Sequence, residues 1–146
     1  MSESVDENMG NTHSLNNSST HLPEKGETMK THKDLDIWKR GIELVTEVYK
    51  LTRNFPREET YGLSSQMQRA AVSYPLNIAE GAARNSKADY SRFIYIALGS
   101  LSELETQVII SKNLAYSSDI EKLLTEIEIL RKMTLNFIKH LKRENG

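Results

Sequence analysis

Apolar residues recur at alternating steps of three and four along much of the chain, which is the spacing of one face of an α-helix. The pattern predicts a first helix from Ile37 to Phe55, ended by Pro56, and a second helix from about Glu58 to Ala83. The apolar stripe of the first helix consists of Ile37, Gly41, Leu44, Val48, Leu51 and Phe55. The inward line of the second helix consists of Leu63, Met67, Ala70, Tyr74, Ile78 and Gly81.

Two further helices are predicted, each preceded by a serine and an acidic residue at the spacing of a capping box. Ser86 with Asp89 marks the start of the third helix, which should fade near Asn113, and Ser118 with Glu121 marks the start of the fourth. Four amphipathic helices joined by short connections can bury their stripes together as a bundle. The sequence therefore predicts an all-α fold, an up-down-up-down antiparallel four-helix bundle.

The first 33 residues lack this periodicity. They contain 13 Ser, Thr or Asn residues, 6 apolar residues and no aromatic residue. Such a segment cannot bury enough apolar surface to offset the entropy lost on ordering. We therefore expect a disordered N-terminal tail from Met1 to Lys33 and one bundle domain over residues 34–146. The spacing of His13, His21 and His32, without cysteine partners, favours a solvated tail over a metal site.

The first helix carries a second apolar line beside its stripe, formed by Trp38, Ile42, Val45, Tyr49 and Thr52. The resulting apolar arc is wider than a helix needs to face a single neighbour. This helix is therefore expected to contact more than its own bundle.

The second helix contains a proline, Pro75, at a position that costs roughly 3 kcal/mol in a free helix. Small residues around it allow a neighbouring backbone to approach closely. A polar line runs along the same helix, formed by Gln66, Arg69, Ser73, Asn77, Glu80 and Arg84. This line fits either a solvated face with a Glu80–Arg84 ion pair or a specific surface for another subunit or a partner. The expected oligomer interface comprises Trp38, Ile42, Tyr49, Pro75, Asn77, Ala79 and Glu80.

Composition narrows the possible functions. With 19 basic and 20 acidic residues, the net charge of −1 gives no general expectation of binding to nucleic acid or to an anionic membrane. The chain has no cysteine, no secretory signal and no run of 18 apolar residues, so we expect a cytoplasmic protein without a membrane span. A di-iron site needs Glu-x-x-His on two helices, whereas the residue three before His140 is Phe137. We therefore expect no catalytic residue, no metal, no cofactor and no enzymatic activity.

Several segments, taken in order, carry a resemblance to a known family: Asp34 to Lys39 (DLDIWK), Leu51 to Pro56 (LTRNFP), Tyr61 to Leu63 (YGL), Asn77 to Gly81 (NIAEG) and Ala97 to Glu105 (ALGSLSELE). Together they resemble the four-helix-bundle proteins encoded in intervening sequences of bacterial 23S ribosomal RNA genes. The resemblance implies a homopentameric ring. It also implies a distant similarity to the accessory protein of diversity-generating retroelements, which binds a reverse transcriptase and nucleic acid through a basic surface.

Two classes of function remain open at this point. The first is a non-catalytic oligomeric scaffold that binds RNA, or a nucleic-acid enzyme such as a reverse transcriptase-like protein. The residues expected to carry that binding are Arg69, Arg84, Lys87 and Arg92. The second is a purely structural or protein-adaptor bundle, in which the arginines pair with Glu80, Asp89 and Glu103 and bind no nucleic acid.

Overall fold

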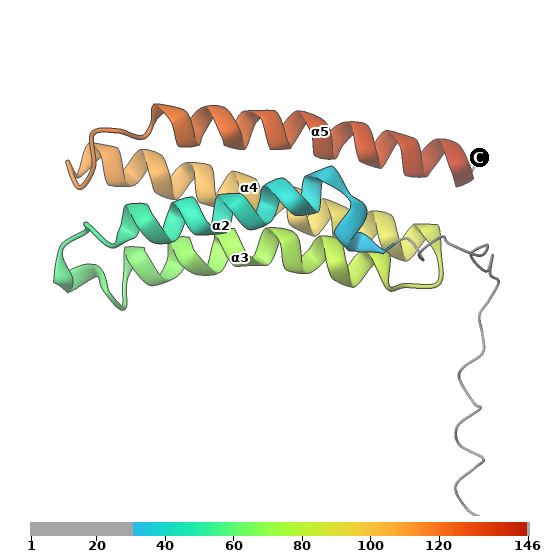
Figure 1. Ribbon diagram of the computed structural model, residues 1–146, viewed down its shortest axis with the longest axis horizontal. Coiled ribbons are helices and arrows are strands. Elements are labelled where there is room, and N and C mark those ends of the chain that lie inside the picture. The colour runs from blue at the N-terminus through green and yellow to red at the C-terminus, as the bar shows by residue number, and fades with distance from the viewer. Residues whose placement is uncertain (1–30, 146) are drawn as a thin grey trace, which may run out of the picture. The chain divides into compact units, whose positions relative to one another are not determined.

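The computed structural model describes residues 31–145 of the chain. These residues form η2 (His32–Asp34), α2 (Asp36–Thr52), η3 (Arg57–Glu59), α3 (Leu63–Ala82), α4 (Lys87–Asn113) and α5 (Glu121–Asn145). The four α-helices lie side by side and run alternately in opposite directions (Figure 1). The predicted all-α, up-down-up-down bundle is thus confirmed. Residues 1–30 of the expected tail lie outside the described residues.

The described chain begins with a capped turn. The hydroxyl oxygen of Thr31 accepts a hydrogen bond from the Lys33 N–H at 3.1 Å, and the Asp34 carboxylate accepts one from the Thr31 N–H at 2.9 Å. The ring of His32 packs edge-on against Trp38, with 5.1 Å between the ring centroids. The folded unit therefore includes the three residues Thr31, His32 and Lys33, which composition alone assigns to the tail.

The predicted stripes supply the hydrophobic core. Side chains that are fully buried come from all four helices and include Leu44, Met67, Ile94, Leu104 and Ile127. Full burial of such a side chain stabilises a fold by about 1.5–3 kcal/mol relative to exposure. The hydrophobic pattern is therefore the main reason why these helices form one bundle.

Close approach of neighbouring helices to α3 depends on two glycines. A Cβ atom at Gly41 of α2 would lie 2.8 Å from the ring of Tyr74 and 3.4 Å from the Cβ of Pro75. A Cβ atom at Gly81 would lie 2.9 Å from the Cβ of Phe93 on α4. Pro75 is itself buried in this packing, so contacts within the subunit hold the helix around it. Its side chain is buried within the subunit, and its expected role in an oligomer interface stays a prediction.

The predicted start of the second helix is wrong. The second helix begins at Leu63 instead of Glu58, because the chain first passes through η3 and then breaks at Gly62. The Glu59 carboxylate accepts hydrogen bonds from the Leu63 N–H at 2.9 Å and from the Tyr116 hydroxyl at 2.7 Å, and so joins the start of α3 to the chain between α4 and α5.

The two predicted capping boxes have different outcomes. Ser86 is confirmed as the N-cap of α4, since its hydroxyl oxygen accepts a hydrogen bond from the Asp89 N–H at 3.1 Å. The fourth helix begins at Glu121, so Ser118 lies outside its first turn. Ile120, directly before that helix, is fully buried, so its side chain lies in the core at the point where α5 begins.

Candidate nucleic-acid and self-association surfaces

Two arginines and a phenylalanine lie together at the connection between α3 and α4. The guanidinium carbons of Arg84 and Arg92 are 4.7 Å and 4.6 Å from the centroid of the Phe93 ring. Arg84 also pairs with Glu80 at 2.8 Å, and Arg92 pairs with Asp89 at 3.8 Å. We call Arg84, Arg92 and Phe93 the arginine cluster. It combines fixed positive charge with an aromatic ring, as nucleic-acid-binding surfaces often do.

Local sequence explains how this cluster forms. Because Gly81 has no side chain, Phe93 and Tyr90 can pack directly against the end of α3. The N-cap at Ser86 then starts α4 soon after α3 ends, which brings Arg92 back toward Arg84. Phe93 is the member of the cluster that sequence reasoning missed. Its position next to Arg92, in a protein with few aromatic residues, was the available signal.

The structure brings together three of the four expected nucleic-acid-binding residues, and separates the fourth. Arg84, Lys87 and Arg92 all lie at or near the α3–α4 connection and are exposed. Arg69 lies on α3, fifteen residues before Arg84, which corresponds to about 22 Å along a helix axis. Arg69 is therefore outside the arginine cluster.

Arg69 instead lines a groove of about 400 Å³ on the outer side of α2 and α3. Tyr49 contributes to it from α2, and Val72, Leu76 and Asn77 contribute from α3. Tyr49 is 43% exposed and Leu76 is 60% exposed, although both are large and hydrophobic. Sequence reasoning missed Leu76. It could have been found from its position four residues after Val72, on a face of the helix other than the inward line. We call the exposed side chains of Ile42, Tyr49 and Leu76 the apolar face.

The other residues expected at an interface are partly engaged within the subunit. Trp38 is half-buried against His32. Asn77 donates hydrogen bonds to the backbone oxygen of Ser73 at 2.8 Å and to its hydroxyl at 3.0 Å. That hydroxyl also accepts a hydrogen bond from Ser100 of α4 at 2.8 Å.

Glu80 and Ala79 complete the expected interface. Glu80 is exposed and holds Arg84, whereas Ala79 is half-buried. Since the Ser73–Asn77 part of the polar line forms a contact between α3 and α4, that line is not simply a solvated face.

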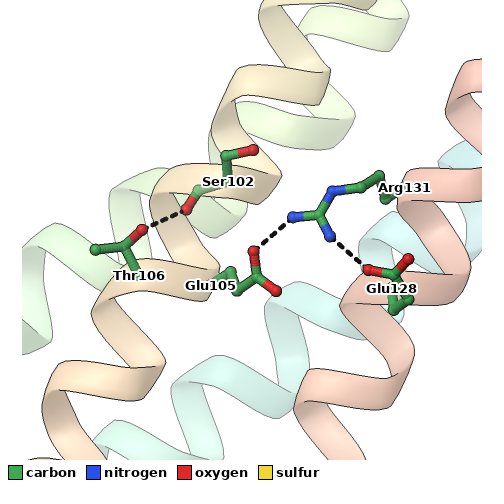
Figure 2. A network of polar contacts seen from close by, with 5 residues as sticks. All are labelled: Ser102, Glu105, Thr106, Glu128 and Arg131. Carbon is green, nitrogen blue, oxygen red and sulfur yellow. Dashed lines mark hydrogen bonds and ion pairs between the residues drawn. The ribbon is translucent and has the colours of Figure 1, made fainter.

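Ion pairs between helices neutralise other arginines. Arg131 of α5 binds Glu105 of α4 and Glu128 of its own helix, both at 2.6 Å (Figure 2). Burial lowers the pKa of Arg131, but the hydrogen bonds and charges of Glu105 and Glu128 outweigh this effect and raise it. Arg40 of α2 makes a two-pronged contact with Glu126 at 2.8 and 3.0 Å. These two arginines therefore serve the bundle and do not offer free charge to a ligand.

Three observations on the described residues concern metal ligands, a buried tyrosine and membrane-spanning helices. No group of three or more metal-ligating side chains is found among them. Burial raises the pKa of Tyr74 to about 12, which keeps this core hydroxyl protonated and unsuited to act as a base at neutral pH. Within residues 31–145, α4 is the one helix long and apolar enough to cross a membrane. Core helices also have this character, and the buried stripe of α4 packs against α3 and α5.

Comparison with known proteins agrees with this architecture. Residues 33–136 match the model of the family described as 23S rRNA-intervening sequence protein. The fold is similar to the crystal structure of a protein of unknown function from the S23 ribosomal protein family of Bacteroides thetaiotaomicron. The TM-score is 0.64 at 22% sequence identity, over 70% of this chain and 98% of that one.

No curated protein matches the sequence. The two descriptions found for the family and for the similar structure name no catalytic activity. The family match spans most of the bundle, and the similar crystal structure shows the same fold. The chain belongs to the 23S rRNA-intervening sequence protein family.

Proposed function

We propose that this protein is a non-catalytic, homo-oligomeric scaffold that binds nucleic acid through the arginine cluster. The observation that carries the proposal is the apolar face, where Ile42, Tyr49 and Leu76 are between 42% and 60% exposed on two adjacent helices. Tyr49 and Leu76 line one groove, and exposed apolar surface of this kind is typical of interaction sites. Covering it with a second copy of the chain explains why α2 carries Ile42 and Tyr49, the two residues of its second apolar line that its own bundle leaves exposed.

A ring of five copies is what the family resemblance implies, and we adopt it as part of the proposal. Closed symmetry repeats every surface feature of a subunit around the ring. The arginine cluster would thus be presented five times, which strengthens binding to a long anionic polymer even though each subunit is close to neutral. RNA is the proposed ligand, and a reverse transcriptase-like protein is the proposed type of protein partner.

A second candidate function is a structural or protein-adaptor bundle without nucleic acid. The ion pairs at the cluster favour it, because Arg84 and Arg92 already contact Glu80 and Asp89. These pairs are exposed, however, and exposed ion pairs contribute only about 0–1 kcal/mol. A phosphate group can therefore replace the carboxylates at small cost, so we rank nucleic-acid binding first.

Assembly is tested by placing charge on the apolar face. The double change Ile42→Glu with Leu76→Glu should yield a monomer with unchanged helical circular dichroism. Ile129→Glu provides the matched control, because Ile129 is a partly exposed apolar residue on α5, outside the apolar face. That variant should sediment like the wild type. If the double variant and the wild type have the same mass, the apolar face is not the interface.

Nucleic-acid binding is tested by its dependence on salt. Release of counterions from neutralised phosphates should lower the logarithm of affinity by roughly 0.7–0.9 per phosphate for each tenfold rise in salt. Arg84→Glu with Arg92→Glu should remove this dependence while the bundle stays folded. Lys122→Glu with Lys132→Glu, in the first half of α5, changes the net charge equally and lies toward the other end of the bundle, so this variant should retain the salt dependence. Absence of binding by the wild type at about 50 mM salt would favour the adaptor function.

A further inference from the structure

The arginine cluster has a geometry that simple phosphate binding does not require. Both guanidinium groups lie over the ring of Phe93. Arg84 also donates a hydrogen bond to Glu80 at 2.8 Å, and Arg92 lies at the ion-pair distance of 3.8 Å from Asp89. Contact with an aromatic ring stabilises a guanidinium. The ring contact, and for Arg84 the hydrogen bond as well, therefore favours the observed placement of the guanidinium groups before any ligand arrives.

The arginines nevertheless stay accessible. The side chain of Arg84 is 41% exposed and that of Arg92 is 60% exposed. Phe93 underneath them is only half-buried, so the cluster is at the surface of the bundle. A planar group from a ligand can therefore reach the guanidinium groups without any movement of the helices.

Charge alone makes this a weak phosphate site. Arg84 and Arg92 supply two positive charges, and each of them is paired with a carboxylate, of Glu80 or of Asp89. The carboxylates thus offset much of the positive charge of the cluster. The attraction that is left is screened at physiological salt, where the Debye length is about 8 Å. Binding at the cluster therefore needs a contribution that carboxylates do not cancel, and stacking on a guanidinium face is such a contribution.

We propose that the arginine cluster stacks unpaired nucleobases, so that the protein prefers single-stranded nucleic acid to duplex. This inference rests on the nucleic-acid binding proposed above, and names the form of nucleic acid that the site selects. Bases in a duplex are already stacked on each other, whereas unpaired bases can stack on aromatic rings or arginine planes. Stacking of one base on an aromatic side chain is worth roughly a 5- to 150-fold change in affinity.

The test separates bases from phosphates. Fluorescence anisotropy would compare a labelled oligothymidylate strand of about twelve nucleotides with an abasic deoxyribose phosphodiester of the same length and with a G·C-rich duplex of that length. We expect the wild type to bind the oligothymidylate at least about fivefold more tightly than the abasic strand. The duplex should bind less tightly than the oligothymidylate, because its bases are already stacked on each other.

Substitution by lysine then removes the planar groups and keeps the charges. In the double variant Arg84→Lys with Arg92→Lys, affinity for the abasic strand should be unchanged and the preference for the oligothymidylate should be lost. Arg57→Lys is the matched control, because Arg57 is exposed in the α2–α3 connection, at the opposite end of the bundle (Figure 1). The control variant should keep the preference.

The outcomes distinguish the inference from the function on which it rests. Equal binding of oligothymidylate and abasic strand by the wild type overturns the stacking proposal, but leaves nucleic-acid binding in place. A preference that survives in the double lysine variant also overturns it. Absence of binding to all three probes overturns both the stacking proposal and the nucleic-acid part of the proposed function.

Discussion

The side-chain oxygens of Tyr74 and Thr134 lie 2.7 Å apart in the centre of the bundle and join α3 to α5 across the core. Both residues are fully buried. The Thr134 hydroxyl donates its hydrogen to the backbone oxygen of Leu130 at 2.6 Å, so the Tyr74 hydroxyl is the donor to Thr134. The two hydroxyl groups therefore have unequal roles: Thr134 keeps a partner without Tyr74, whereas Tyr74 depends on Thr134.

This asymmetry predicts unequal costs for the two deletions. Thr134→Val leaves the buried Tyr74 hydroxyl without an acceptor and should lower the free energy of unfolding by about 1–3 kcal/mol. Tyr74→Phe removes one hydrogen bond and should cost about 0.5–1.5 kcal/mol. Chemical denaturation at a fixed protein concentration measures both. The double variant should be more stable than Thr134→Val alone, and the opposite order would contradict the assigned direction of the hydrogen bond.

Two glycines on neighbouring helices should respond in opposite ways to alanine. At Gly81 an added Cβ would lie 2.9 Å from the Phe93 Cβ and 3.2 Å from the Tyr90 backbone oxygen, so overpacking should cost about 1–3 kcal/mol. The better helix propensity of alanine offsets about 1 kcal/mol of that loss. At Gly99 an added Cβ meets nothing within 4 Å, so Gly99→Ala should stabilise the folded subunit by up to about 1 kcal/mol. Thermal unfolding of the two variants side by side checks this contrast.

The end of α4 contains a residue under backbone strain. Ala115 has a φ of 61°, and the chain around it makes the two hydrogen bonds of a Schellman motif, from Ala115 N to Lys112 O at 2.9 Å and from Tyr116 N to Ser111 O at 3.0 Å. Glycine adopts this conformation without the steric penalty of a Cβ atom. Ala115→Gly should therefore raise the free energy of unfolding by about 1 kcal/mol. A lower midpoint of urea denaturation in this variant would show that the strain is absent.

The free energy of unfolding should depend on pH through the carboxyl group of Glu59. Hydrogen bonds from the Leu63 N–H and the Tyr116 hydroxyl lower the pKa of Glu59 below its ordinary value of 4.5. A lowered carboxyl pKa contributes stability that is present above the ordinary value and is lost as pH falls through the lowered one. The difference in stability between wild type and Glu59→Gln should thus shrink as pH falls from about 7 to about 3. A difference that is the same at every pH would rule out this role of the carboxylate.

The sequence was sufficient to predict the core, because the helical period identifies the positions that face inward, among them Leu44, Met67 and Ile127. It was not sufficient for the helix start at Leu63, since that start depends on Glu59 and its long-range contact with Tyr116. The burial of Pro75 was also missed, because propensity does not show which neighbour packs against a proline. Contacts between helices, not spacing along one helix, decide these features.

Only part of the candidate site could be predicted from the sequence, and the reason is similar. Arg84 and Arg92 come together because a short connection reverses the chain between α3 and α4, and that connection was readable from the N-cap at Ser86. Arg69 shares a helical line with Arg84, but fifteen residues, or about 22 Å of helix axis, separate them, so residues on one line need not belong to one site. The contact of both arginines with Phe93 depends on the close approach at Gly81, which a single sequence does not reveal.

The mass of the wild-type protein in solution tests the central claim most directly, because both the covered apolar face and the repeated arginine cluster require assembly. Light scattering coupled to gel filtration, at micromolar concentration, should give a mass of about five times the 16.7 kDa of one chain. The apolar face of each copy would then be buried against its neighbour. A mass of 16.7 kDa, that of a single chain, would contradict the proposed scaffold.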